Sequence, residues 1–296
     1  MPVAPLVSGD DMSKTKRRID VYAMTWRLPI ILWQALFFVG PIAFMIAMSF
    51  FLVKNYRMTE AFEFVNWQRM FSRGFFWDSY WHTLFIASLS TVCAMCLAFP
   101  AAYMLAFRAS ENTRRMAIFL LILPFFSSYL VRTFSWFVIL AESGVVNAML
   151  GWIGLGPYTM LNTTFGTLVG YMTLTLPLVV ILQTLSMANI DKTLVEAAHN
   201  LGCKPFETIW RVVIPLAKTG LIIAAVFCFI LSFGDFVAPF YLGGSQDPTL
   251  PILIIDTTKS GQQWPRAAVV AIVMMLTLFA VAAAGIGLAY RKGSSR

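Results

Sequence analysis

Hydrophobic residues along this chain are grouped in six long runs separated by shorter polar stretches. Each run is longer than the ~20 residues that an α-helix needs to cross about 30 Å of hydrocarbon. None shows the alternation of apolar and polar residues typical of a membrane β-strand. The pattern predicts an all-α integral membrane protein with six transmembrane helices, at residues 28–53, 82–107, 116–140, 164–186, 219–242 and 266–290.

Five of these runs contain a proline, which removes a backbone donor and disfavours a regular helix. Transmembrane helices tolerate proline because neighbouring helices and side chains can satisfy the freed backbone groups. The sequence therefore predicts kinks within continuous spans at Pro41, Pro100, Pro124, Pro177 and Pro239.

The composition supports a membrane solvent. Of the 296 residues, 59% are hydrophobic and 12% are charged, whereas soluble domains carry about 25% charged residues. The net charge of +8 would suggest nucleic acid in a soluble protein, but cytoplasmic loops of membrane proteins also retain an excess of lysine and arginine. We therefore expect the chain to lie in a lipid membrane and not to bind nucleic acid.

The basic residues also predict the orientation. Fifteen of the 22 lysines and arginines fall in the first segment, the second and fourth loops and the tail, which lie on one side of a six-span topology. By the positive-inside rule, both termini face the cytoplasm. The expected organisation is a cytoplasmic tail at 1–27, a transmembrane domain at 28–290 with a cytoplasmic loop at 187–218, and a second cytoplasmic tail at 291–296.

Two outer loops carry signals of their own. The loop at 54–81 is rich in aromatic residues, which favours interfacial anchoring but also suits docking of an external partner. The segment 145–153 is expected to form a short helix in the membrane interface. Cys93 and Cys96 form a C-x-x-C inside an apolar run without nearby histidines, so packing thiols are expected and no metal site is predicted.

The most informative segment is the fourth, cytoplasmic loop, which is long for so compact a membrane protein. Residues 194–201 read as a short helix that stops at Gly202, because glycine accepts the left-handed conformation common at helix ends. Pro205 suits the first turn of a second short helix, which is expected to end before Pro215. Two short helices joined at a glycine would make an elbow that protrudes into the cytoplasm.

This loop resembles the "EAA loop" of ABC importer permeases, which reads Glu-Ala-Ala, three residues, Gly, nine residues and Ile-x-Leu-Pro. Val212 and Ile214 stand where the pattern has isoleucine and leucine. The resemblance implies a coupling helix that docks in a groove of a cytoplasmic ATPase. It assigns ATPase coupling to the residues that match in register: Glu196, Ala197, Ala198, Gly202 and Pro215.

A wider resemblance covers about half of the chain. The segments LPFFSSYLVRTFSWFVIL, GVVNAML, LVEAAHNLG, SFGDFVAPFYLGG and WPRAAVVAIVMM look like those of spermidine/putrescine permease subunits. The resemblance implies a second, homologous permease, two cytoplasmic ATPase subunits and a periplasmic solute-binding protein. ATP would be bound by a separate subunit, with no cofactor in this chain. Related permeases for opines and other small organic solutes remain an alternative.

Two charged residues fall inside predicted spans at equal depth. Arg132 and Asp235 each lie about 24 Å from the cytoplasmic end at ~1.5 Å per residue. Because an unpaired charge in hydrocarbon is costly, they could form a structural pair, or Asp235 could attract a cationic solute on the translocation path. In a third interpretation, the Arg132 side chain snorkels, so that its charged end reaches the membrane interface. Trp136, one turn beyond Arg132, and Glu142, near the outer end of the span, are further path candidates.

Other functions are less well supported by the residues. The nucleotide-binding pattern G-x-x-x-x-G-K is absent, so the chain is not expected to be the ATPase itself, or an enzyme. An ion-driven secondary transporter would need ionisable groups or broken helices at the midplane, often in repeated halves. The sequence shows one strong intramembrane acid and no obvious repeat. A transport subunit of the bacterial inner membrane is therefore the function that the sequence favours.

Overall fold

The structure, a computed structural model, describes residues 21–54, 57–244, 248–260 and 262–290. The chain divides into two compact units, Met1–Met48 and Ser49–Arg296. The tails predicted at 1–27 and 291–296 lie largely or wholly outside the described residues. The first unit contains helix α1 (Val21–Gln34), a π-helical segment η1 (Ala35–Val39) and helix α2 (Gly40–Met48).

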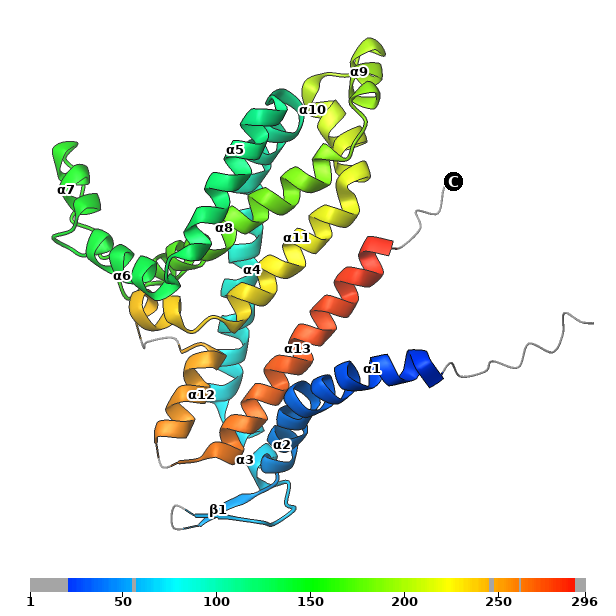
Figure 1. Cartoon of the computed structure of the whole chain (residues 1–296). Helices are drawn as coiled ribbons and strands as arrows, with labels where there is room; N and C mark the ends of the chain where they lie inside the picture. Colours follow the sequence, from blue (N-terminus) through cyan, green and yellow to red (C-terminus); the bar gives the residue numbers. More distant parts are fainter. Residues whose placement is uncertain (1–20, 55–56, 245–247, 261, 291–296) are drawn as a thin grey trace, which may run out of the picture. The chain divides into compact units, whose positions relative to one another are not determined.

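Four long helices form the centre of the second unit: α4 (Gly74–Tyr103), α8 (Thr164–Ala188), α11 (Ile214–Gly234) and α13 (Trp264–Tyr290). Helices α4, α8 and α11 pack on one another, and α13 packs against α11 and α12 (Leu250–Lys259) (Figure 1). Small residues permit close contacts between α8 and its neighbours. A Cβ atom on Gly170 of α8 would lie 2.4 Å from the Cβ atom of Ala238, so only glycine fits this contact.

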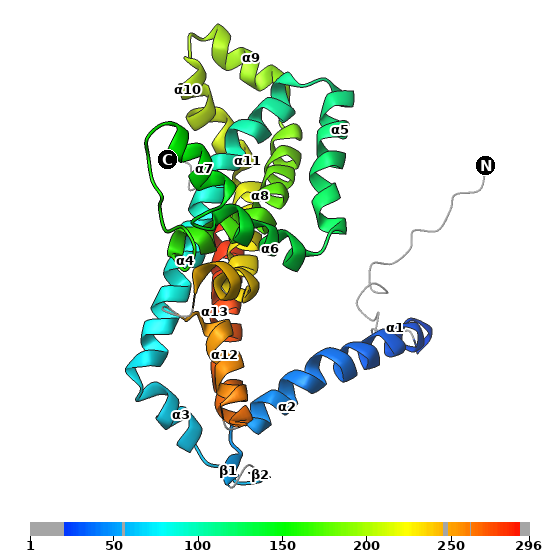
Figure 2. The ribbon, with the colours of Figure 1, turned by 90° about the vertical axis from the view of Figure 1, so that its left-hand side faces the viewer.

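The two ends of this unit carry different elements. One end has a hairpin of two three-residue strands, β1 (Leu52–Lys54) and β2 (Arg57–Thr59), followed by α3 (Val65–Phe71). The opposite end has α9 (Lys192–Asn200) and α10 (Pro205–Thr208), which project beyond the long helices in both views (Figures 1 and 2). The predicted all-α class is confirmed, apart from this short hairpin.

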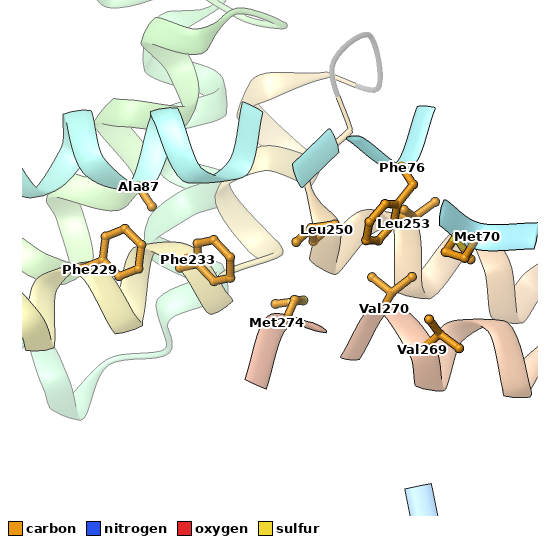
Figure 3. Packing of buried hydrophobic residues seen from close by; sticks show 10 residues of the cluster. All are labelled: Met70, Phe76, Ala87, Phe229, Phe233, Leu250, Leu253, Val269, Val270 and Met274. Atoms are coloured by element: carbon orange, nitrogen blue, oxygen red, sulfur yellow. The ribbon is translucent and has the colours of Figure 1, made fainter. Parts of the chain in front are cut away.

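A hydrophobic cluster ties α3 to the long helices. Met70 of α3 packs with Val269 and Val270 of α13, while Phe76 of α4 lies beside Leu253 of α12 (Figure 3). The cluster continues along α4 and α11 through Ala87, Phe229 and Phe233. The predicted aromatic loop at 54–81 is therefore partly folded structure, because α4 already begins at Gly74.

Six helices among the described residues are long and apolar enough to cross a membrane, which agrees with the predicted number. The fourth and sixth lie close to their predicted positions. The first ends earlier than predicted, and the second and fifth begin earlier. The six spans are Trp26–Met48, Gly74–Arg108, Tyr129–Trp152, Thr164–Ala188, Pro205–Gly234 and Trp264–Tyr290.

The third predicted span, 116–140, is wrong as a continuous helix. Helix α5 (Glu111–Ile122) passes into a 3-10 turn, η3 (Leu123–Phe126), and a new helix α6 (Tyr129–Leu140) follows. Pro124 stands at the start of the turn and cannot donate a helical hydrogen bond. The Ser127 hydroxyl donates to the Pro124 carbonyl at 2.8 Å, which satisfies one of the backbone acceptors at the break. Here proline breaks the span instead of kinking it.

The fifth predicted span, 219–242, is also broken, between α11 and the π-helical segment η5 (Pro239–Gly243). Its other end extends further than predicted. Helix α10 continues through the π-helical segment η4 (Ile209–Val213) into α11, so the second short helix does not end before Pro215. Pro215 lies two residues after the π-helical segment, whose wider turn accommodates its missing N–H.

Candidate functional site

Helices α9 and α10 are specified by hydrogen bonds at their ends. The Asp191 carboxylate accepts the backbone N–H of Thr193 at 2.9 Å and caps the start of α9. This hydrogen bond holds the pKa of the Asp191 carboxyl below its ordinary value. Pro205 begins α10, and the Glu207 carboxylate accepts the backbone N–H of Lys204 at 3.3 Å.

Gly202 ends α9 in the predicted way. Its φ angle is +86°, a left-handed conformation that is costly for residues with a Cβ. The N–H of Gly202 donates to His199 and that of Cys203 donates to Ala198, which together form a Schellman motif. A Cβ atom on Gly202 would meet nothing within 4 Å, so glycine is needed here for the backbone and not for space.

The two faces of α9 have different surroundings. Val195 packs into a cluster with Met187 of α8 and Val213 of η4, and Ala198 is buried as well. Glu196 and Ala197 are exposed, as is Leu201 at 86% of its surface. The motif's two alanines therefore differ, since Ala198 packs inward and only Ala197 faces outward.

The turn also presents apolar side chains to its surroundings. Leu194 and Phe206 are exposed in addition to Leu201, and the Phe206 ring lies 6.2 Å from that of Trp210. Exposed apolar groups on a projecting turn are a feature of partner-binding surfaces. Of the matched motif residues, the structure brings Glu196–Gly202 together in one helix and turn, while Pro215 lies apart in the first turn of α11.

Asp235 forms a joint at the break in the fifth span. Its carboxylate accepts the backbone N–H groups of Val237 and Ala238, each at 3.1 Å, and so caps the helical turn that leads into η5. The Tyr129 hydroxyl donates to the same carboxylate at 2.7 Å. Asp235 is only 9% exposed. We call Tyr129, Asp235 and the two backbone amides the Asp235 joint.

The structural pair of Arg132 with Asp235 is not formed. Arg132 instead donates from Nη1 to the Thr173 carbonyl of α8 at 3.2 Å, and its guanidinium lies 5.9 Å from the Tyr129 ring centre. In the described parts of the chain, the ion pair found is that between Arg115 and Glu111. The Arg132 Nε is buried without a hydrogen-bond partner among the described residues. The Asp235 carboxylate instead accepts from the Tyr129 hydroxyl and two backbone amides.

The remaining path candidates lie further along α6 and just beyond its end. Trp136 is half-buried, one turn beyond Arg132. Glu142 is exposed in the turn that joins α6 to α7 (Val145–Trp152). Helix α7 occupies most of the segment predicted as a short helix, 145–153. Sequence reasoning missed Tyr129 and Thr173, because a tyrosine and a backbone carbonyl give no charge signal.

The described residues offer no obvious site for a metal. They contain no group of three or more histidine, cysteine, aspartate or glutamate side chains placed to hold an ion. All four cysteines, Cys93 and Cys96 included, carry free thiols. We call helices α9 and α10 and the residues between them, Lys192–Thr208, the α9–α10 turn. This turn and the Asp235 joint are the features on which a functional assignment rests.

Residues 94–292 match the family of binding-protein-dependent transport system inner membrane components. The chain is 27% identical over 270 residues to the spermidine/putrescine transport system permease protein PotB of Salmonella typhimurium (strain SL1344), covering 90% of this chain and 92% of that protein. It is 29% identical over 181 residues to the molybdenum transport system permease protein ModB of Azotobacter vinelandii, covering 60% of this chain and 79% of that protein.

Solved structures of transporters share the fold. A bacterial ABC transporter involved in the import of the acidic polysaccharide alginate has a TM-score of 0.69 at 19% identity, covering 93% of this chain and 96% of that one. The MetNI methionine ABC transporter in an inward-facing conformation has a TM-score of 0.55 at 15% identity, covering 75% of this chain and 96% of that one. At these identities, both similarities show a shared fold alone.

Proposed function

The chain belongs to the family of binding-protein-dependent transport system inner membrane components, and from this premise we propose that it forms part of the translocation path for a polyamine. As a family member it is a multi-pass inner-membrane permease subunit of an ABC importer, a transport component and not an enzyme. The assignment of putrescine or spermidine is supported by the similarity to PotB along 90% of the chain.

The proposed assembly contains a second, homologous permease, two cytoplasmic ATPase subunits that bind ATP, and a periplasmic solute-binding protein. Six spans alone make a thin pore, so a second permease would complete the path. The positive-inside count supports an orientation in which both termini are cytoplasmic. In that orientation the α9–α10 turn faces the ATPase subunits.

The rigidity of the α9–α10 turn is the observation that supports a coupling role. A rigid element can transmit a rigid-body movement between subunits, whereas a flexible loop would absorb it. Capping by Asp191 and the Schellman motif at Gly202 rigidify the turn, and Val195 anchors it to the core. The exposed Glu196, Ala197 and Leu201 would then contact the ATPase.

The path is proposed to pass along α6, where Arg132 and Trp136 occupy successive turns, and to reach Glu142 just beyond the end of this helix. The exposed Glu142 would attract a cationic solute at the mouth, and Trp136 could stack on an ammonium group. We assign Asp235 to the joint between broken helices and not to solute binding, because its carboxylate accepts three hydrogen bonds within the chain.

One observation favours a second solute class. No acidic side chain among the described residues forms an ion pair with Arg132, and a guanidinium beside the path would repel a polyamine. A solute with a carboxylate, such as an opine, would supply the missing negative charge. We therefore carry an importer for small carboxylated solutes as the alternative.

The test is solute-stimulated ATPase activity of the complete importer in proteoliposomes. Wild type is compared with Gly202→Asp, and Gly202→Asn is the matched control. Asparagine and aspartate are similar in size and both tolerate a left-handed conformation, so the two variants differ in the negative charge placed on the turn. We expect putrescine or spermidine, added with the binding protein, to stimulate wild type and the asparagine variant. The aspartate variant should assemble with the other subunits but lose most of this stimulation.

Each outcome separates the parts of the proposal. Stimulation by a carboxylated solute alone would keep the importer and replace polyamines by the alternative. Normal stimulation of Gly202→Asp would refute the coupling role of the turn. ATPase activity of this subunit purified alone would contradict the assignment of ATP binding to a separate subunit.

A further inference from the structure

Three arginines from three different elements gather at the end of the second unit opposite α9. Arg69 belongs to α3, Arg73 directly precedes α4, and Arg266 lies in the first turn of α13. The packing of Met70 against Val269 and Val270 explains the gathering (Figure 3). Met70 is the neighbour of Arg69, and the two valines lie one turn beyond Arg266. We call these three residues the arginine triad.

The triad is not neutralised by the chain. The positive charges of Arg69 and Arg73 both act on the guanidinium of Arg266. Within the described ranges, no member forms an ion pair. The Arg266 Nε is buried and has no hydrogen-bond partner among these residues. Like charges held close together are unfavourable, and a bound anion would remove this cost.

The triad lies where two apolar spans begin. Arg73 precedes the span Gly74–Arg108, and Arg266 is the third residue of Trp264–Tyr290. Spans end at the level of the lipid headgroups, so the guanidinium groups are expected near the phosphates.

An apolar stripe continues from the triad along α4. Trp77 and Trp81 of α4 are four residues apart, which places them on one face of the helix, and Arg73 directly precedes its first turn. Trp77 is 42% exposed and Trp81 is 60% exposed. Tryptophans with this exposure at a span end are typical of contact with lipid. A soluble acidic partner would satisfy the arginines but would leave this aromatic stripe uncovered.

We propose that the arginine triad binds the phosphate of an anionic phospholipid, whose acyl chains cover the stripe formed by Trp77 and Trp81. Arginine suits this ligand because its planar guanidinium can donate two parallel hydrogen bonds to phosphate oxygens. The site is independent of the transported solute and of the coupling role of α9. It makes the importer sensitive to the anionic lipid content of its membrane.

The test is native mass spectrometry of the complete detergent-solubilised importer, titrated with phosphatidylglycerol or with phosphatidylcholine. Arg266→Gln is compared with Lys259→Gln, which removes the same charge from α12 outside the triad. We expect Arg266→Gln to weaken phosphatidylglycerol binding about fivefold, with phosphatidylcholine unaffected. Lys259→Gln should bind like wild type. Arg266→Lys should recover part of the affinity, since lysine keeps the charge but not the paired donors.

Two controls distinguish a bound lipid from other anions that could occupy the triad. Inorganic phosphate is added as a competitor, and displacement of the lipid at millimolar concentration would assign the site to free phosphate. Binding-protein-stimulated ATPase activity is measured on the same variants. Unchanged lipid binding with loss of this stimulation in Arg266→Gln would assign the triad to an acidic protein surface, and would overturn the proposal. Melting temperatures confirm that the variants are folded.

Discussion

The α9–α10 turn and the Asp235 joint both redirect the chain, but they do so by different means. The turn is formed by neighbours in sequence, because Asp191, Gly202 and Glu207 each bond within a few residues of themselves. The joint depends on Tyr129, which lies 106 residues away from Asp235. The turn is largely exposed, whereas Asp235 and the residues of its two backbone donors are buried and Tyr129 is partly buried.

This difference indicates how the two regions respond to change. A locally capped, exposed turn can be altered without unpacking the long helices, so its substitutions should affect partners more than stability. A buried joint between two broken helices cannot lose one member without leaving polar groups unsatisfied in a low-dielectric interior. Four substitutions test this contrast, in order of decreasing expected effect on stability.

Replacing Asp235 by alanine should have the largest effect. It would leave the Tyr129 hydroxyl and two backbone N–H groups without their acceptor. With about 1–3 kcal/mol for each unsatisfied buried group, and partial rescue by water, we expect destabilisation of about 3 kcal/mol. Thermal unfolding in detergent measures it. Asp235→Asn, which keeps an acceptor for the cap, should lose less, and an unaltered melting temperature for the alanine variant would contradict the joint.

Tyr129→Phe should have a smaller effect of about 1–2 kcal/mol, because the carboxylate keeps its two backbone donors. Its effect should not add to that of Asp235→Asn, since the two residues share one hydrogen bond. A double-mutant cycle of melting temperatures measures this coupling. Additive effects would show that the two side chains act independently.

Gly202→Ala should cost about 1 kcal/mol, all of it in the local stability of α9. The cost arises from the φ angle of +86° and not from crowding, because the position has open space around it. Hydrogen exchange should speed up in 192–203 and remain unchanged in α8. Gly170→Ala provides the contrast, since its added Cβ would collide with Ala238 and loosen the packing of α8.

Asp191→Ala should have the smallest effect, confined to faster hydrogen exchange at the start of α9. The lowered pKa of the Asp191 carboxyl determines how the effect of this substitution depends on pH. The charged cap contributes above the ordinary value of 3.8, and its contribution is lost as the pH falls through the lower value of the folded state. Wild type and Asp191→Ala should therefore converge in strongly acidic buffer. Asp191→Asn, which cannot ionise, should show no such loss.

Local features of the turn could be predicted because their causes are adjacent in sequence. Gly202 marks the end of α9 and Pro205 the start of α10, and both appear as expected. The continuation of α10 through η4 into α11 was not predicted, because a π-helical segment lets the chain pass Pro215 without a stop. The functional assignment of the turn stays a prediction that the ATPase assay tests.

The charged pair shows the opposite case. Equal depth in two predicted spans made Arg132 and Asp235 natural partners, but depth says nothing about which helix faces which. The break at Pro124 reorients α6, so that Tyr129 reaches Asp235 and Arg132 meets the Thr173 carbonyl instead. Proline marked both broken spans in the sequence, yet whether a proline kinks or breaks a helix depends on which neighbours can satisfy the freed groups.

By itself the sequence determined the membrane class, the number of spans and the short capped helices of the motif, because hydrophobic run length and local capping need no knowledge of the fold. Only the tertiary structure decided the partner of Asp235, the inward packing of Ala198 and the gathering of Arg69, Arg73 and Arg266. These contacts join residues far apart in the chain. Their energies depend on which helices pack together, and packing follows from the shapes of many side chains at once.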